Sequence, residues 1–363
     1  MTDIFLIAGE ASGDQLGEGL LHALYQQNPH LQVRGVGGPK MRAAGMEIVY
    51  PMEELQVMGF IDVLFSLPSL IRRFYKTIDA ILQAQPKVVI TIDYPGFNLR
   101  LARMLRKKGF KGKICHYVCP SVWAWGKKRI QLMAENLDLL LSILPFEKQL
   151  FAATPLCVEY IGHPLVQKMV PQESSDSVVA FYPGSRTKEI ERNFPFFLRL
   201  ISSLQRDFPH FRYVVSVAQE KYRPLLQQLA SSTSLELLSP VELQKLKPTL
   251  AIAKSGTITL ELALREIPTV VTYAISPLDI FLAKHIFNIS LPYYALPNLI
   301  ARKSVFPELI GPALTDETLL QTVKNLILNK DACKAECQHL RSILGSENSN
   351  TRSAQLILTL LKG

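Results

Sequence analysis

The sequence lacks several of the features by which protein classes are recognised. It has no apolar run near the ~18–20 residues that a membrane-spanning helix requires. It has no D-x-D pair and no histidines and carboxylates at ligand spacing, so we expect no dedicated divalent-metal site. The apolar stretch 4–8 has no basic residues before it and is followed at once by Glu10 and Asp14. We therefore expect a buried strand there rather than a signal peptide.

Cysteine is scarce and is not arranged for zinc or redox chemistry. The five cysteines include two C-x-x-x-C pairs, Cys115 with Cys119 and Cys333 with Cys337. Neither pair has the C-x-x-C spacing of zinc or redox sites, and no histidines stand at the matching distance. We therefore expect reduced thiols and a cytoplasmic protein.

The composition is that of a globular protein with surplus positive charge. The 363 residues are 48% hydrophobic and 20% charged, and they suffice for two domains of ordinary size. The formal net charge of +9 suits a phosphate-rich partner, which leaves a nucleotide, an anionic membrane surface and nucleic acid open.

Short apolar runs alternate along the chain with longer segments of helical period, a pattern typical of parallel α/β layers. We expect strands at 3–8, 88–93, 113–118, 138–144, 158–161, 177–182, 213–217, 249–253 and 269–273. We expect helices between them, among others at 14–27, 97–108, 192–207 and 257–265, and a last helix at 350–362.

The polar, proline-containing stretch 167–176 divides this pattern into two series. We therefore predict two Rossmann-like, doubly wound domains, 1–166 and 177–345, joined by a linker at 167–176. Residues 346–363 form a C-terminal helix that we expect either to stand alone or to return to the N-terminal domain. Ligands of such sheets bind beyond the carboxyl ends of the strands, so we expect the site in the cleft between the domains.

Three turns rich in glycine and serine each follow a strand and precede a helix. Their sequences are GEASGD (9–14), PGSR (183–186) and KSGT (254–257). Small residues let the backbone approach an anion, and the N–H groups of the following helix can bind phosphate oxygens. None matches a P-loop or a complete dinucleotide fingerprint. Each alone is typical of an ordinary tight turn, but three together, one beside Arg186, favour phosphate binding.

Asp93, in the segment IDYPGFN (92–98), stands where a long apolar strand ends. A carboxylate partly shielded from water has a raised pKa and suits a general base. Asp93 could equally cap the helix that begins near Phe97. Its position alone leaves both interpretations open.

Both tryptophans lie in one loop, PSVWAWG (120–126), next to three basic residues. Trp123 and Trp125 could stack on a sugar ring or hold an acyl chain. The segment by itself favours the other interpretation, in which they fasten the loop to the core.

The segment 60–74 carries more apolar residues than a surface helix needs for its own core, and Arg72, Arg73 and Lys76 close it. The segment 100–113 carries seven Lys or Arg and no acid. Apolar residues flanked by cations favour contact with an anionic membrane or an acyl chain, although a buried helix and a solvated basic helix remain alternatives. The lipid-facing candidates are Phe60, Ile61, Val63, Leu64, Leu67, Leu70 and Ile71.

Taken together the motifs resemble those of the lipid-A-disaccharide synthase family, whose fold is the GT-B glycosyltransferase fold. The matching pieces are AGEASGD (8–14), GVGGPKM (35–41), MEELQVMG (52–59), DYPGFN (93–98), HYVCPSVWAWGKKR (116–129), LPFEK (144–148), IGHPL (161–165), PGSRTKEI (183–190), SGTITLE (255–261), LPNLI (296–300) and PEL (307–309). They occur in the family's order and span nearly the whole chain.

The resemblance implies a reaction and a place for it. The family transfers 2,3-diacylglucosamine from UDP-2,3-diacylglucosamine to 2,3-diacylglucosamine 1-phosphate (lipid X), which gives the β-1,6-linked lipid A disaccharide 1-phosphate and UDP. The transfer inverts the anomeric centre. It uses no cofactor and belongs to lipid A biosynthesis at the cytoplasmic face of a Gram-negative inner membrane, where a protein of this kind would be peripherally associated.

The resemblance also implies roles for individual residues. Asp93 corresponds to the family's essential aspartate, the base for the acceptor hydroxyl. The donor-binding residues implied are Arg186 for the diphosphate, Ser255, Gly256 and Thr257 in the second phosphate turn, Glu261 for the ribose hydroxyls and Asn298 of the LPN motif, with Ser12 and Gly13 in the loop opposite the donor. The chain departs from the family pattern at Gly96, where an acidic residue is frequent, and at Cys119, where serine is usual.

Two other functions compete with this one. A UDP-sugar epimerase shares the fold and the nucleotide chemistry, but it would not need the apolar segment 60–74. A non-catalytic, membrane-associated nucleotide-binding protein would not need Asp93. No nucleic-acid-binding module is recognised, so we expect no nucleic-acid partner. Acyl-chain preference and homo-oligomer formation stay open.

Overall fold

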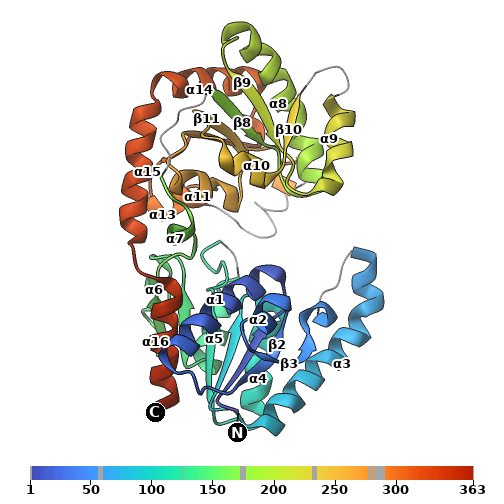
Figure 1. Ribbon diagram of the computed structural model, residues 1–363, viewed down its shortest axis with the longest axis vertical. Helices are drawn as coiled ribbons and strands as arrows, with labels where there is room; N and C mark the ends of the chain where they lie inside the picture. The colour runs from blue at the N-terminus through green and yellow to red at the C-terminus, as the bar shows by residue number, and fades with distance from the viewer. Residues whose placement is uncertain are drawn as a thin grey trace. The chain divides into compact units, whose positions relative to one another are not determined.

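The computed structural model describes residues 2–55, 60–124, 126–171, 177–230, 235–276, 279–280 and 291–362, with the backbone alone described for 60–68. The chain divides into two compact units (Figure 1). The first unit comprises Met1–Pro164 together with Ser346–Gly363, and the second comprises Leu165–Gly345.

The first unit is built on a seven-stranded parallel sheet in the order β3-β2-β1-β4-β5-β6-β7. Its strands are β1 (Ile4–Ala8), β2 (Val33–Gly37), β3 (Glu47–Pro51), β4 (Val88–Ile92), β5 (Lys113–Tyr117), β6 (Leu139–Ser142) and β7 (Cys157–Tyr160). Its helices are α1 (Ala11–Gln27), α2 (Pro39–Ala43), α3 (Phe60–Ala84), α4 (Pro95–Lys107), α5 (Lys128–Asn136), α6 (Glu147–Leu150) and α16 (Ser349–Lys362). The strand order reverses between β1 and β4, the place where Rossmann-like sheets bind ligands.

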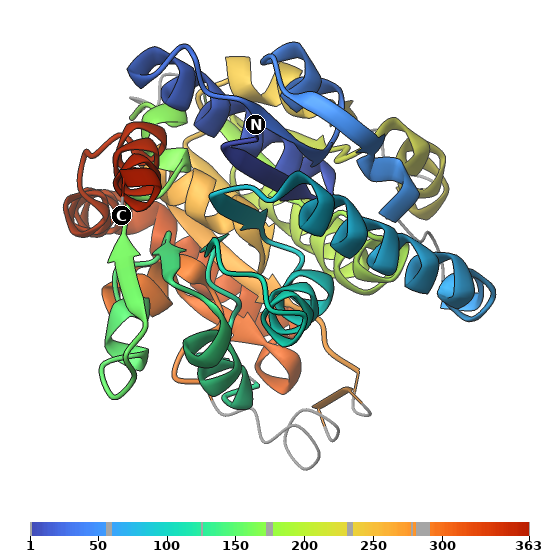
Figure 2. The same ribbon diagram turned by 90° about the horizontal axis from the view of Figure 1, so that it is seen from below.

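Both faces of this sheet are buried. Alternate residues of β1 point to opposite faces, so Phe5 and Ile7 pack with α3, α4 and α5, whereas Leu6 packs with α1 and α16. Helix α16 lies alongside α1 (Figure 1, Figure 2) and contributes the buried Ile357 to this second core. The helix that follows the second unit in sequence therefore belongs to the first unit.

The second unit is built on a six-stranded parallel sheet in the order β10-β9-β8-β11-β12-β13. Its strands are β8 (Val178–Tyr182), β9 (Arg212–Ser216), β10 (Glu236–Leu238), β11 (Leu250–Lys254), β12 (Thr269–Tyr273) and β13 (Glu308–Ile310). Its helices include α7 (Leu165–Lys168), α8 (Thr187–Asp207), α9 (Arg223–Ala230), α10 (Pro240–Lys245), α11 (Thr257–Leu264), α13 (Leu296–Ala301), α14 (Asp316–Leu328) and α15 (Lys330–Leu344).

The predicted fold class is confirmed, because both sheets are parallel and carry helices between their strands. All nine expected strands are present within two residues of the expected ends, and the sequence pattern missed β2, β3, β10 and β13. Strand β2 (VRGVG) escapes a search for apolar runs because of its glycines. Gly35 is required there, since a Cβ at this position would lie 1.9 Å from the Leu6 carbonyl oxygen of β1.

The predicted lipid-facing segment 60–74 forms the first part of helix α3. The side chains of Phe60, Ile61, Val63, Leu64 and Leu67 lie outside the described residues. Leu70 is half-buried and packs against the core of the first unit, whereas Ile71 is 49% exposed. Within the described part of the chain, no helix has the length and apolarity needed to cross a membrane.

Candidate active site

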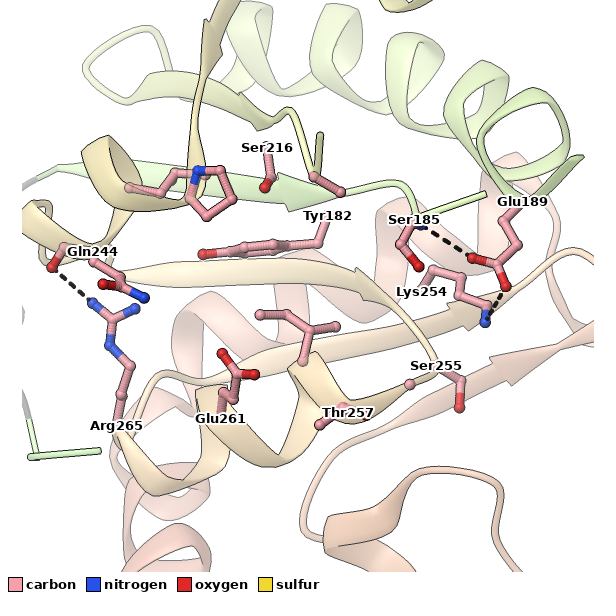
Figure 3. A pocket seen from close by; sticks show the side chains of 16 residues that line it. Tyr182, Ser185, Glu189, Ser216, Gln244, Lys254, Ser255, Thr257, Glu261 and Arg265 are labelled. Atoms are coloured by element: carbon pink, nitrogen blue, oxygen red, sulfur yellow. Dashed lines mark hydrogen bonds and ion pairs between the residues drawn. The ribbon is translucent and has the colours of Figure 1, made fainter. Parts of the chain in front are cut away.

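A cavity of about 330 Å³ opens in the second unit at the carboxyl ends of β8 and β11 (Figure 3). Ala253 of β11 pairs with Tyr182 of β8, so the loops that follow these two parallel strands emerge side by side. The cavity is lined by Tyr182, Gly184, Ser185, Glu189, Ser216, Ala218, Pro240, Leu243, Gln244, Lys254, Ser255, Gly256, Thr257, Ile258, Glu261 and Arg265.

One end of the cavity is formed by the two predicted phosphate turns. Glu189, in the first turn of α8, accepts hydrogen bonds from the backbone N–H of Ser185 at 3.1 Å and from Lys254 Nζ at 3.0 Å. Gly184 has a φ of +131°, and a Cβ there would lie 2.7 Å from Glu189 Cβ, so this loop requires glycine. Glu189 thus joins the loop after β8 to the loop after β11.

Charge at this end is partly shielded from water. The side chain of Lys254 is 15% exposed and that of Glu189 is 12% exposed. Burial raises the pKa of Glu189, but hydrogen bonds from Lys254 and Ser185 and the charges of Lys254 and Arg186 hold this pKa below its ordinary value. Glu189 is therefore ionised at neutral pH.

The other end of the cavity presents polar side chains around an aromatic ring. Figure 3 shows Glu261 rising from α11 toward the cavity, with Tyr182 across from it and Arg265 beside Gln244. Arg265 Nη2 donates to the Gln244 carbonyl oxygen at 3.1 Å. Burial raises the pKa of Glu261, and the nearby Arg265 opposes this shift.

The structure brings four of the predicted donor-binding residues together at this cavity: Ser255, Gly256, Thr257 and Glu261. Arg186 is not among the lining residues; its side chain is 81% exposed and reaches Glu189 with a 3.4 Å ion pair. Sequence reasoning missed Lys254 as a site residue. Its signal was a cation at the last position of a buried strand, as the first residue of the KSGT turn.

The side-chain amide of Asn298 makes four hydrogen bonds, all within the second unit. Its Nδ2 donates to the Phe306 carbonyl oxygen at 2.7 Å and to Glu308 Oε1 at 2.8 Å. Its Oδ1 accepts from the backbone N–H groups of Val305 and Phe306, each at 2.9 Å. Asn298 is 1% exposed and does not line the cavity. Contact between Asn298 and the donor stays a prediction.

In the first unit, Asp93 follows β4 in a strained turn. Asp93 and Tyr94 have φ values of +48° and +47°, a left-handed conformation that is costly for residues other than glycine. Asn98 stabilises this turn, because its Nδ2 donates to the carbonyl oxygens of Asp93 at 2.6 Å and of Ile92 at 3.2 Å. The Asp93 N–H donates to the Tyr117 carbonyl oxygen at 2.9 Å.

The half-buried Asp93 has a second carboxylate near it. Burial raises the pKa of Asp93, and a hydrogen bond from the Tyr94 backbone opposes this shift. The pKa of Glu10 is raised by burial and by the negative charge of Asp93. Glu10 was missed by sequence reasoning, although it lies in a loop that follows β1, the strand paired with β4. Asp93 and Glu10 thus define an acidic corner of the first unit.

Of the other residues in the first turn, 9–14, Gly13 and Asp14 are buried and pack within the first unit. Gly13 is buried, and a Cβ there would lie 3.2 Å from Ala8 Cβ, whereas Ser12 is exposed in the first turn of α1. Asp14 is buried and accepts hydrogen bonds from the N–H groups of Gly38 (2.8 Å), Lys40 (3.0 Å) and Met41 (3.1 Å). Asp14 therefore stabilises the start of α2. Its hydrogen bonds join the motif AGEASGD (8–14) to the motif GVGGPKM (35–41).

Trp123 packs edge-on against Phe146, with ring centroids 6.0 Å apart. This contact agrees with the interpretation that Trp123 fastens its loop to the core. Trp125 lies outside the described residues.

Glu147, in the LPFEK motif, is a buried carboxyl group whose titration should be measurable. It is 1% exposed and accepts hydrogen bonds from Ser142 Oγ at 2.6 Å and from the Leu144 N–H at 3.3 Å. Burial raises the pKa of Glu147 to about 7, although these hydrogen bonds oppose the shift.

We expect this group to make the protein less stable as the pH rises. The folded pKa of about 7 lies above the ordinary 4.5, so between about pH 5 and pH 7 the unfolded chain has lost a proton that the folded protein keeps. The free energy of unfolding should fall by about 2 kcal/mol over this interval. In Glu147→Gln this contribution should vanish, whereas Glu135→Gln, at an exposed site, should retain it. Equal pH dependence in all three proteins, measured by denaturant unfolding, would contradict the assignment.

The two parallel sheets, each with helices between its strands and with a cavity at the strand ends of the second, define the GT-B class of fold. Solved structures of this fold include UDP-GlcNAc 2-epimerase of Neisseria meningitidis (TM-score 0.61, 13% identity, covering 99% of this chain and 100% of that chain). They also include MurG of Acinetobacter baumannii (TM-score 0.57, 15% identity, covering 99% and 100%). Identities this low establish the fold alone.

Sequence comparison gives the family: a sequence model of lipid-A-disaccharide synthetase matches residues 4–360, and the chain belongs to this family. The lipid-A-disaccharide synthase of Pseudomonas putida is 36% identical, with 99% of this chain and 98% of that protein covered. That of Chlamydia felis is 43% identical over 85% of this chain and 51% of that protein. The chain thus spans about half the length of the chlamydial relative.

Proposed function

We propose that the protein is an inverting glycosyltransferase that condenses UDP-2,3-diacylglucosamine with lipid X and releases UDP. The observation that carries the proposal is the half-buried Asp93 at the end of β4, within the family motif DYPGFN. A UDP-sugar epimerase of the same fold, or a non-catalytic binding protein, is the alternative that the assay below separates.

In the proposed reaction Asp93 is the general base. Its carboxylate takes the proton of the acceptor 6-hydroxyl while the hydroxyl oxygen attacks the anomeric carbon of the donor. The bond from that carbon to the UDP oxygen breaks, and the electron pair leaves with UDP. A carboxylate with a raised pKa is a better proton acceptor, which supports this role.

The cavity of the second unit is proposed to hold the UDP part of the donor. Glu261 lines this cavity and would accept hydrogen bonds from ribose hydroxyls, and Ser255, Gly256 and Thr257 lie at the end proposed for the diphosphate. Arg186, exposed beside that end, would add positive charge as the diphosphate leaves. Asn298 holds the loop that carries Val305 and Phe306, and its contact with the donor stays a prediction.

A second cavity, of about 480 Å³, supports a site for an acyl chain next to Asp93. It is lined by Leu70, Ile71, Phe74, Tyr75, Tyr94, Gly96, Phe97 and Arg100. The walls are largely apolar, and Tyr94 directly follows the proposed base. We propose that this groove and the exposed part of α3 meet the lipid portions of the substrates at an anionic membrane surface, with the protein peripherally associated on the cytoplasmic side.

The test is to incubate the purified protein with UDP-2,3-diacylglucosamine and lipid X, and to follow UDP and disaccharide together. Both products should form in equal amounts, and neither should form without lipid X. An epimerised UDP-sugar formed without an acceptor would establish the first alternative. Binding of UDP without any product would establish the second.

The chemical step should not need a divalent cation. Among the described residues, no group of three His, Cys, Asp or Glu side chains is placed to hold a metal ion, while Lys254 and Arg186 supply positive charge beside the cavity. We expect turnover to persist in excess chelator. A loss of activity on chelation that magnesium or manganese restores would show that charge stabilisation has been misassigned.

Membrane association should depend on the exposed apolar side chains of α3. Ile71 and Tyr75 are 49% and 46% exposed, so replacing both with serine should weaken binding to anionic vesicles severalfold and leave the melting temperature within a few degrees. Leu328→Ser, at an 82% exposed site of the second unit, is the matched control and should change neither property. Unchanged vesicle binding, or unfolding of the double variant, would count against the proposal.

A further inference from the structure

Lys254 differs from Arg186, the exposed cation beside the phosphate turns, in how firmly it is held. Its ammonium group is largely buried, lies 3.0 Å from Glu189 Oε1, and stands 4.6 Å from the centroid of the Tyr273 ring. The Arg186 side chain, by contrast, is 81% exposed. Lys254 therefore presents a positive charge at a fixed place in the cavity wall, and ordering it on ligand binding costs little entropy.

Among the residues that the structure describes, Glu189 accepts a hydrogen bond from this ammonium group. A lysine ammonium carries three N–H donors, and Glu189 accepts one of them. Lys254 is the last residue of β11. It lies next to Ser255, Gly256 and Thr257 and across from Ser185. Lys254 lines the same cavity as the phosphate turns, so its charge would attract an anion that binds there.

We propose that Lys254 binds the diphosphate of the nucleotide donor directly and that Glu189 is a positioning residue, which holds the ammonium group and the loop after β8 in one arrangement. The inference rests on the proposed function, because it assumes that the cavity holds a nucleoside diphosphate. The Lys254–Glu189 pair has a purely structural alternative role, which is to join the two loops. The two roles predict different binding results.

The experiment is calorimetric titration with UDP and with uridine, which share the nucleoside and differ in the diphosphate. Lys254→Met should weaken UDP binding roughly 10- to 100-fold, as expected for loss of one charged hydrogen-bonding partner. Uridine affinity should stay within about twofold, because uridine lacks the group that Lys254 binds. Lys188→Met removes a nearby exposed cation outside the cavity lining and should leave both affinities unchanged.

A second variant separates direct binding from repulsion by a stranded carboxylate. Lys254→Met leaves the Glu189 carboxylate without its lysine partner. The double variant Lys254→Met/Glu189→Gln removes the negative charge of Glu189 as well. It also takes the place of the single variant if the single variant fails to fold. We expect UDP binding to remain weak in the double variant. Recovery of UDP affinity there, an unchanged affinity in Lys254→Met, or an equal loss for uridine would overturn the inference while leaving the proposed function intact. If the unmodified protein binds no UDP, the proposed function fails and the inference with it.

Discussion

Replacing Asp93 with asparagine is expected to lower turnover by roughly two orders of magnitude or more, with the fold and UDP affinity preserved. Asparagine has the same shape, so the left-handed turn and the hydrogen bonds from Asn98 to the Asp93 and Ile92 carbonyl oxygens can persist. It cannot accept the proton of the acceptor hydroxyl. Disaccharide formation under saturating substrates measures the effect.

The pH dependence of the same reaction gives an independent check. The base must be ionised, so activity should fall as the pH drops through the pKa of Asp93, which burial raises above the ordinary 3.8. The residual activity of Asp93→Asn should lack this acid limb. Asp79→Asn, at an exposed carboxylate of α3, is the matched control and should leave both rate and pH profile unchanged. Near-normal turnover in Asp93→Asn would remove Asp93 from the mechanism.

Replacing Asn298 with aspartate is expected to destabilise the second unit by about 3–5 kcal/mol, because it buries a second carboxylate against that of Glu308. The carboxylate would lose the donor group that reaches Phe306 and Glu308, and it would face the Glu308 carboxylate across a contact that is now 2.8 Å. The melting temperature should fall by roughly 10 °C. Thermal unfolding followed by circular dichroism measures this directly.

Two further variants sharpen the result for Asn298. Asn298→Ala leaves the Phe306 N–H without its acceptor and the Val305 N–H with the Lys303 carbonyl oxygen at 3.1 Å, and it should also unfold at lower temperature. Asn325→Asp, at an exposed position of α14, should unfold at the original temperature. A normal melting temperature for the Asn298 variants, combined with weak UDP binding, would instead establish direct contact with the donor.

The fold was largely predictable because buried parallel strands have sequences that are continuous apolar runs, such as VVITI in β4 and VVAFY in β8. Strand β2 was not, since its Gly35 serves a close approach to Leu6 of β1, a residue far away in sequence. The short strand β13 (Glu308–Ile310) likewise has too few residues to show a pattern. Local periodicity therefore gives the long central strands and omits the short or glycine-containing ones.

The sequence alone indicates candidate site residues where one segment carries the whole signal, as for Asp93 and the SGT turn, and their roles stay predictions. The sequence does not indicate contacts that form where two loops meet. Lys254 and Glu189 are 65 positions apart, and only the pairing of β8 with β11 brings them to 3.0 Å. In the same way Glu10 becomes a neighbour of Asp93 through the pairing of β1 with β4. Motifs indicate which residue types are present, but strand order decides which of them meet.

The return of α16 to the first unit has a consequence for synthesis on the ribosome. The core face formed by Leu20 and Leu24 of α1 is completed by Ala354 and Ile357, which are translated only after all of Leu165–Gly345. At ~5–20 residues per second this interval is roughly 10–40 s. During it the nascent first unit carries an uncovered apolar face, whereas the second unit, being continuous in sequence, can fold as soon as it emerges. The order of folding should therefore be the reverse of the order of translation, and the nascent first unit is the stage at which chaperone binding is expected.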